Sequence, residues 1–465
     1  MTEELIKQKE SHETAESTAR LVDGPIVSGL MRLSLPLIAS AFMSTLYTLV
    51  DMFWVGKLGA EVMAGVGVAG MFTWLASGFI KLASVGSQVY TGQRLGYGDR
   101  RAAGKYAACG IRLSIILGVS YGLVCFLFAD DFVGFFGLSE RVAIETAETY
   151  LTITCGLIVV FFSGYVMTCL FTAQGNSRLP MIANFTGLIL NIIIDPFLIF
   201  GWWIFPELGA AGSAIATVFS QFIVLLVLTL NIRGDNVLRN GRKDGLKFIH
   251  VEWKYYSSVI RLGIPTAIQE MFYCGISIIL SRLIASFGDI AVAAMRVGGQ
   301  IEAVSWNTAT GFSNAINAFV SQNFGAGKPD RIRKGYHASV AFVAGEGLIV
   351  TLIFILLRKQ IAGLFFHDPE GVKIFCAYLC VVGISEMFMN TEMMTSGALA
   401  GLGRTHVSSV ICVVFTLIRL PLAYGLAAFT TLGSTSVWLA ISISSILKGL
   451  LMFAAFQKCS AHIDK

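Results

Sequence analysis

Long apolar runs recur along the whole chain, and short polar segments separate them. An α-helix needs roughly 20 largely apolar residues to cross a hydrocarbon core about 30 Å thick. Runs of this length predict about twelve transmembrane helices, each with ends placed only to within several residues. The predicted spans are 30–55, 62–88, 105–129, 147–172, 180–203, 209–231, 257–285, 291–318, 336–357, 376–400, 406–429 and 433–456.

Composition supports a membrane protein. Of the 465 residues, 55% are hydrophobic and 14% are charged, whereas a soluble domain carries about 25% charged residues. The net charge of +5 is scattered over short loops and not gathered in one stripe, so we expect no nucleic-acid partner. The nine cysteines lie in or beside apolar runs without a zinc-ligand pattern, so we expect neither a metal nor a cofactor.

Basic residues set the expected orientation. They are concentrated in the loops after the second and eighth spans and in the middle loop, whereas the loops after the third and fifth spans are mainly acidic. Since Lys and Arg stay on the cytoplasmic side, we expect a multi-pass protein of the cell (inner) membrane with both termini cytoplasmic. Arg358 and Lys359 are the exception to this bias. The first residues lack the pattern of a cleaved signal, and we expect them to form a solvated tail.

The chain contains an internal repeat. Placing Pro36 on Pro265 aligns about sixty residues without a gap, so that the phrase 93–98, QRLGYG, falls on 322–327, QNFGAG. Each half holds six predicted helices, which gives parallel repeats related by an axis along the membrane normal. The expected fold is therefore all-α, with two pseudo-symmetric six-helix bundles. The expected segments are a cytoplasmic tail 1–28, an N-lobe 29–232, a cytoplasmic basic linker 233–256, a C-lobe 257–457 and a tail 458–465.

Ionisable residues inside the spans cost free energy and suggest a function. Asp51 lies one helical turn after Tyr47, and Asn191 lies one turn before Asp195, so each pair shares a helix face. Carboxyl and amide oxygens suit sodium, and desolvated carboxyls suit proton uptake. The alternative is a buried network that only joins the first helix to the fifth. Prolines inside spans should also bend helices and free backbone carbonyls; they are Pro36, Pro196 and Pro265.

The phrase 36–59, PLIASAFMSTLYTLVDMFWVGKLG, the two glycine-containing loop phrases and the run 175–201, GNSRLPMIANFTGLILNIIIDPFLIFG, resemble the multidrug and toxic compound extrusion (MATE) family over nearly the whole chain. The resemblance fits prokaryotic DinF-type members better than NorM-type ones. It implies a MATE/MOP-type fold and export of small cationic or amphipathic compounds by antiport against H⁺ or Na⁺, through alternating access. It also implies a cation or substrate site at the positions Tyr47, Asp51, Asn191 and Asp195.

The second half does not copy these acids, because Leu280 aligns with Asp51. NorM-type members bind the coupling cation on helices seven and ten, but Glu270 lies shallower than that pattern expects. The second-lobe candidates are Glu270, Glu302 and Glu386. The alternative, favoured for Glu346 and Glu392, is ion pairing within the lobe with Arg282, Arg296 or Arg419. We expect Lys81 to neutralise a nearby acid or to snorkel.

Adaptable Met and Phe side chains could line a binding surface for varied compounds, although they are also common in lipid-facing helices. The candidates for such a substrate pocket are Met167, Met271, Phe272, Met389 and Met393.

Other classes of protein fit the sequence less well. The glycine loops lack the spacing of a phosphate-binding loop, so we expect no ATP site. All six histidines lie in tails, loops or helix ends, which leaves an intramembrane enzyme without a catalytic set. A channel would need a carbonyl-lined filter. A flippase for lipid-linked precursors, from the same broad superfamily, remains the main alternative. We expect a monomer.

Overall fold

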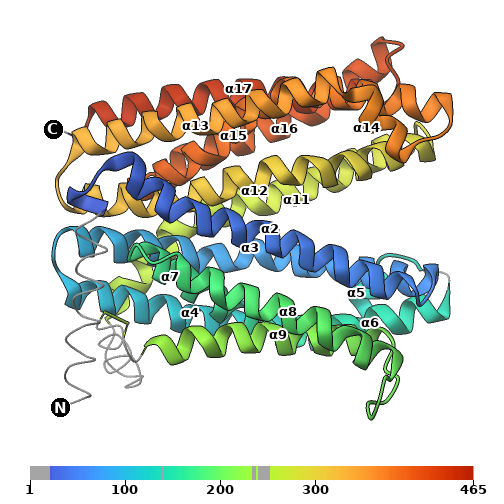
Figure 1. Ribbon diagram of the computed structural model, residues 1–465, viewed down its shortest axis with the longest axis horizontal. Coiled ribbons are helices and arrows are strands. Elements are labelled where there is room, and N and C mark those ends of the chain that lie inside the picture. The colour runs from blue at the N-terminus through green and yellow to red at the C-terminus, as the bar shows by residue number, and fades with distance from the viewer. Residues whose placement is uncertain (1–20, 139, 233–236, 239–251, 464–465) are drawn as a thin grey trace.

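The computed structural model shows two stacked groups of long helices, the N-lobe and the C-lobe (Figure 1). It describes residues 21–138, 140–232, 237–238 and 252–463, and these ranges contain no β-strand. Most of the expected N-terminal tail and basic linker lies outside the described residues. The chain is an all-α polytopic membrane protein.

The N-lobe is built around helix α3, which packs on α4, α6 and α7, while α8 packs on both α2 and α9. Its core consists of small and apolar side chains from these helices, which allows close helix packing. The helices are α2 (Ile26–Gly56), α3 (Ala60–Gly96), α4 (Arg100–Leu127), α5 (Ala129–Gly134), α6 (Arg141–Gly156), α7 (Val159–Ala173), α8 (Arg178–Phe200) and α9 (Ala210–Asn231).

In the C-lobe the central helix is α15, which is the counterpart in the repeat of the pair α6 and α7 and not of α3. It packs on α12, α13 and α17, while α16 packs on α11 and α17. The helices are α11 (Trp253–Ala285), α12 (Asp289–Gly325), α13 (Pro329–Leu356), α14 (Arg358–Phe365), α15 (Pro369–Gly401), α16 (Thr405–Phe429) and α17 (Thr435–Ala461).

Every predicted span coincides with a helix or a helix pair. Ten of the described helices are long and apolar enough to cross a membrane, or up to eleven if the pair α6 and α7, bent by 44°, is one span. The sequence had predicted that pair as one unbroken span, 147–172. Helix α12 has 37 residues but is not among these ten helices, because it is less apolar than they are. The short helices α5 and α14 were not predicted, and they follow the third and ninth spans at matching places in the repeat.

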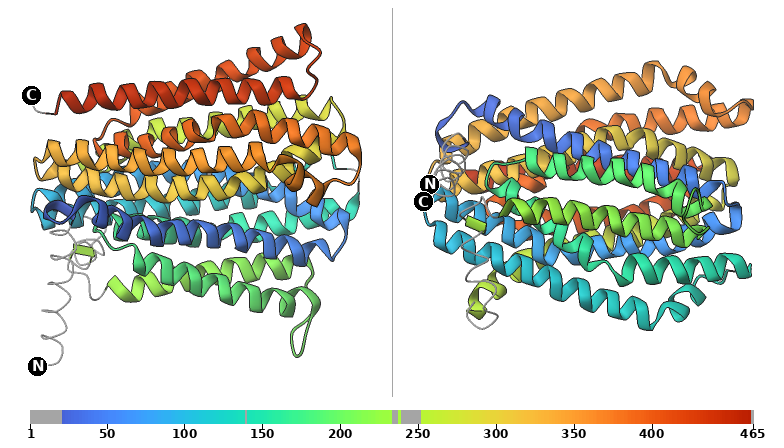
Figure 2. Two further views of the ribbon diagram at one scale, coloured as in Figure 1. Left: turned by 45° about the horizontal axis from the view of Figure 1, so that its top comes forward. Right: turned by 60° about the horizontal axis from the view of Figure 1, so that its bottom comes forward.

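Helices α2 and α17 place their outer termini, Ile26 and Ala461, at one end of the molecule, which we call the terminal end; the opposite end is the far end (Figure 2). The repeated loop phrases also lie at the terminal end, after α3 and α12. Gly98 and Gly327 have φ angles of 88° and 66°, which favour glycine. These phrases are therefore tight turns.

The two lobes meet where α2 packs on α12 and α3 packs on α11. A Cβ added to Gly311 would lie 2.4 Å from Ile38, and one added to Gly86 would lie 2.2 Å from the carbonyl oxygen of Val259. Toward the far end, α2 and α12 diverge (Figure 1) and side chains such as Phe53 are exposed. The close contacts between the lobes are thus concentrated toward the terminal end.

Candidate functional site

A buried polar cluster joins α2 to α8 in the N-lobe. Helix α2 carries Tyr47 and Asp51, and helix α8 carries Asn191 and Asp195, each pair being one helical turn apart. Asp51 is 8% exposed, and Asn191 and Asp195 are fully buried. The Asn191 side-chain amide donates a hydrogen bond of 3.1 Å to Asp195 Oδ1, and the two carboxyls lie close enough to interact electrostatically. The structure therefore brings together all four residues predicted for this site.

Other helices contribute side chains that the sequence had not singled out. Ser213 of α9 donates a hydrogen bond of 2.5 Å to Asp51 Oδ1. Thr217, one turn later on α9, and Tyr150 of α6 interact with Tyr47. The site is thus built from four helices, and hydroxyl groups of α9 and α6 lie beside Asp51. The one available signal was the spacing of Ser213 and Thr217, but serine and threonine are common in lipid-embedded helices.

Two side-chain oxygens of this cluster are buried and have no hydrogen-bond partner among the described residues: Asn191 Oδ1 and Asp195 Oδ2. Buried polar atoms are normally hydrogen-bonded, so each exception needs an explanation. Both of these oxygens can only accept hydrogen bonds, unless the carboxyl is protonated. The arrangement can therefore take up a proton or a small hard cation.

Close packing of α8 against α9 fixes the position of these groups. A Cβ added to Gly212 would lie 2.3 Å from the carbonyl oxygen of Leu198. The backbone of α9 therefore touches the last turns of α8, and Ser213 is held beside Asp51.

The three prolines singled out in the sequence lie inside helices: Pro36 in α2, Pro196 in α8 and Pro265 in α11. Each proline interrupts the backbone hydrogen bonding of its helix.

A second group of acids is buried in the C-lobe. The Tyr378 hydroxyl of α15 donates a hydrogen bond to Glu302 of α12. Glu386 is fully buried, and Glu302, Glu346 and Ser305 lie near its carboxyl group. Asn390 donates a hydrogen bond of 2.7 Å to Glu346. Two of the three second-lobe candidates thus share a site, together with Glu346.

Glu270, the third candidate, has different neighbours. It lies on α11 at the contact between the lobes, where it interacts electrostatically with Lys81 of α3. The Lys81 ammonium lies 5.9 Å from the ring centroid of Tyr165, and a Cβ added to Gly78 would lie 3.7 Å from Cβ of Glu270. Lys81 therefore faces an acid of the opposite lobe.

The C-lobe also contains a buried ion pair. Lys448 of α17 and Glu392 of α15 form an ion pair of 2.8 Å whose side chains are 4% and 9% exposed. Glu392 was expected to pair with an arginine. Arg419 instead donates hydrogen bonds to Ser444 and Ser445. The ion pair of Lys448 with Glu392 explains how charges can be buried in this lobe without a transport role.

The residues proposed for a substrate pocket do not form one cluster. Met167 is buried in the core of the N-lobe. Met271 lies beside Gly78 at the contact between the lobes, while Phe272 is exposed. Met389 and Met393 are half-buried on α15, one turn apart. Of these five residues, Met271 is the one that contacts the opposite lobe.

The residues that the structure describes contain no group of three or more His, Cys, Asp or Glu side chains that could hold a metal ion. All nine cysteines are free thiols.

Comparisons with known proteins agree with this architecture. Residues 36–197 and 265–425 match the MatE family model, one match in each lobe. The chain is 27% identical to a probable multidrug resistance protein NorM of Thermotoga maritima over 434 residues, covering 92% of this chain and 91% of the relative. It is also 26% identical to a FAD transporter of Shewanella oneidensis over 442 residues, which cover 94% of this chain and 96% of the relative.

Solved structures share the fold. A crystal structure of MATE in the bent conformation has a TM-score of 0.88 at 22% identity and covers 96% of this chain and 98% of the other. An outward-facing multidrug resistance MATE family transporter of the MOP superfamily has a TM-score of 0.87 at 21% identity, with the same coverage. With both halves matched by the family model, the chain belongs to the MatE family of membrane transporters and is not an enzyme.

Proposed function

We propose that this protein is a secondary active multidrug efflux transporter, which exports small organic compounds in exchange for H⁺ or Na⁺. The observation that carries the proposal is the N-lobe cluster, where buried oxygens of Asn191 and Asp195 lack hydrogen-bond partners among the described residues. The carboxyl of Asp51 is close enough to that of Asp195 to interact with it electrostatically, so two acids and an amide lie in one buried cluster.

Either cation can satisfy this cluster. A proton on Asp195 would turn one acceptor oxygen into a donor and remove the repulsion between the two carboxylates. Sodium would instead be held by the carboxylate and amide oxygens, which are the ligands that hard cations prefer. In both cases the bound charge offsets the cost of burying the acids.

The cycle that we propose uses alternating access. The basic turns after α3 and α12 lie at the terminal end, so this end faces the cytoplasm by the positive-inside rule, and both termini are cytoplasmic in the cell (inner) membrane. Cation binding near the far end, at Asp51 and Asp195, favours release of the exported compound to the outside. Coupling requires the cation and the compound to bind the two states with different affinities.

The proposed substrates are cationic or amphipathic compounds, handled by a monomer. The multidrug resistance name of the Thermotoga relative supports this class. The Shewanella relative is named a FAD transporter, so an anionic nucleotide is the appropriate comparison compound.

The test is export from proteoliposomes under an imposed pH gradient or sodium gradient, with ethidium and FAD as separate probes. We expect one of the two gradients to drive ethidium export by the wild-type protein, and the gradient that does so identifies the coupling ion. We expect Asp51→Asn and Asp195→Asn to lower the gradient-driven rate at least tenfold. The matched control is Glu61→Gln, which removes an exposed carboxyl at the far end.

Two results would contradict the proposal. Wild-type rates in both acid variants would mean that the cluster is a structural network. Transport of FAD without ethidium would replace the proposed substrate class with anionic nucleotides. The folding of every variant is checked by its elution profile and thermal stability in detergent.

A further inference from the structure

Matching contacts close the terminal end between the lobes. Gln93 of α3 donates a hydrogen bond of 3.0 Å to the carbonyl of Gly401 in the C-lobe. Gln322, its partner in the repeat, donates one of 2.7 Å to the carbonyl of Ala173 in the N-lobe. Each lobe thus binds a helix end of the other, and the two contacts follow the pseudo-symmetry of the chain.

The backbones of the lobes also touch here. A Cβ added to Gly96 would lie 1.9 Å from the carbonyl oxygen of Gln322, and one added to Gly325 would lie 1.9 Å from that of Gln93. No side chain larger than hydrogen fits at either glycine in this state. The repeated glutamine and glycine positions of the two loop phrases are explained by this contact.

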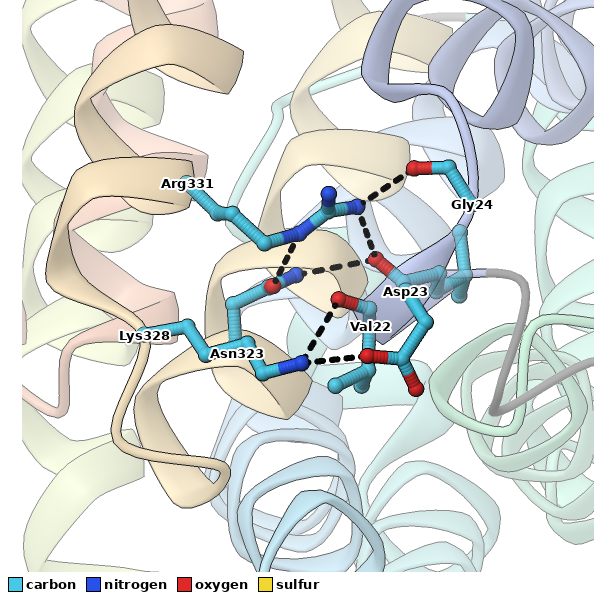
Figure 3. Close-up of polar contacts among 7 residues, drawn as sticks. Val22, Asp23, Gly24, Asn323, Lys328 and Arg331 are labelled. Atoms are coloured by element: carbon cyan, nitrogen blue, oxygen red, sulfur yellow. Dashed lines mark hydrogen bonds and ion pairs between the residues drawn. The ribbon is translucent and has the colours of Figure 1, made fainter.

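A third contact between the lobes involves the residues that precede α2 (Figure 3). Residues 21–24 precede α2, and side chains at the junction of α12 and α13 in the C-lobe hold them. Arg331 donates hydrogen bonds to the carbonyls of Leu21, at 3.2 Å, and Gly24, at 2.8 Å. Its third hydrogen bond, of 3.1 Å, goes to Asn323, which itself donates one of 3.2 Å to Leu21.

A lysine completes this contact. Lys328 donates to the carbonyl of Val22 at 3.3 Å and forms an ion pair with Asp23. The side chain of Leu21 is buried in the C-lobe core, in the cluster that contains Phe319 and Ile332. The segment is therefore bound to the C-lobe by both its backbone and its apolar side chains.

The position of this segment links the contact to the cation site. Residues 21–24 lead directly into α2, which packs on α12 of the C-lobe and on α8 of the N-lobe. The same helix carries Asp51 near its far end. A movement of α2 away from the C-lobe must break the contacts of Asn323, Lys328 and Arg331, because the backbone carbonyls that they bind would move with it.

We propose that residues 21–24, together with Asn323, Lys328 and Arg331, form a latch that holds the terminal end closed and that opens once in every transport cycle. The inference rests on the alternating access of the proposed function. Opening toward the terminal end requires release of the segment from the C-lobe. The latch thus sets the fraction of molecules that are open to that side.

The first test is a reversible cross-link across the latch. Asp23→Cys and Lys328→Cys are combined in a background without the nine native cysteines, and a short bis-methanethiosulfonate joins them. Cross-linking should abolish ethidium export, and a reductant should restore it. The matched control joins His337→Cys and Gln457→Cys, whose side chains contact each other within the C-lobe; this link should leave export unchanged.

The second test does not depend on transport. Arg100→Cys and Lys334→Cys place spin labels at exposed positions of the two lobes at the terminal end. The distance between the labels, measured by pulsed electron paramagnetic resonance, reports the separation of the lobes. Arg331→Ala should raise the ratio of open to closed molecules at least tenfold, and Arg331→Lys should raise it less. Arg101→Ala, an exposed arginine outside the latch, should leave it unchanged.

Full-rate export by the cross-linked protein would overturn the proposal, as would equal distance distributions in Arg331→Ala and wild type. Absence of export by the wild-type protein under either gradient would instead refute the proposed function, while the distances would still show whether the latch controls opening. If Arg331→Ala does not fold, Arg331→Lys and the cross-link decide the outcome.

Discussion

The contact between α8 and α9 gives a prediction that links packing to the cation site. Gly212 has no room for a methyl group, because its Cβ would lie 2.3 Å from the oxygen and 2.5 Å from the carbon of the Leu198 carbonyl. These are backbone atoms and cannot move aside as a side-chain end can. Overpacking of this kind costs about 1–3 kcal/mol. Gly212→Ala should therefore lower the free energy of unfolding by that amount and push α9 away from α8.

The matched control is Gly164→Ala in α7 of the same lobe. Its added Cβ would meet nothing closer than 4.0 Å, the distance to Leu225, so only the helix propensity changes. That change favours alanine by up to about 1 kcal/mol in both variants. The difference between the two variants thus isolates the steric clash.

The assay is SDS-induced unfolding in mixed micelles, combined with gradient-driven ethidium export. Gly212→Ala should be the less stable of the two and should export more slowly, because Ser213 moves with the backbone of α9 and loses its hydrogen bond to Asp51. Equal stability and equal export in the two alanine variants would refute the close packing of α8 and α9.

Three further predictions concern charges and hydrogen bonds away from this contact. Lys448→Met should destabilise the protein by about 3–5 kcal/mol, because it leaves the carboxylate of Glu392 buried without its ion pair. Adding Glu392→Gln should recover most of that loss in the same unfolding assay. A double variant no more stable than Lys448→Met would contradict this prediction. Tyr378→Phe should cost about 1–3 kcal/mol, since Glu302 is buried and loses the Tyr378 hydroxyl, whereas an unchanged unfolding midpoint would argue against that hydrogen bond. Arg141→Ala should change the free energy of unfolding by less than about 1 kcal/mol, because the side chains of Arg141 and its partner Glu145 are 90% and 61% exposed. A larger loss would mean that this ion pair is shielded from solvent.

The sequence alone predicted the helices and the pairing of residues within one helix. The spans were predicted from apolar length, and the site pairs Tyr47 with Asp51 and Asn191 with Asp195 were predicted from their four-residue spacing. The break between α6 and α7 was not predicted, because residues 156–159 are apolar and contain no proline. Hydrophobic periodicity gives no signal for such a bend.

Most contacts between helices could not be predicted from the residues alone; the resemblance to the MATE family implied that the pairs on α2 and α8 share a site. Ser213 is one of many serines in apolar helices, and only the packing of α9 on α8 places it beside Asp51. Glu302 and Glu386 lie 84 residues apart and share a site because α12 packs on α15. The repeated glutamines were seen only as part of a turn motif, since their hydrogen bonds to the opposite lobe depend on how the two halves meet.

The most direct test of cation coupling is the reciprocity of binding in the purified protein. Two ligands that couple through two states must change each other's affinity by the same factor. For wild type we predict that a saturating concentration of the coupling cation weakens ethidium binding at least tenfold, or about 1.4 kcal/mol, and that saturating ethidium weakens cation binding equally. The combined variant Asp51→Asn with Asp195→Asn should bind ethidium with an affinity that does not depend on the cation. The same cation dependence in wild type and in that variant would contradict the account.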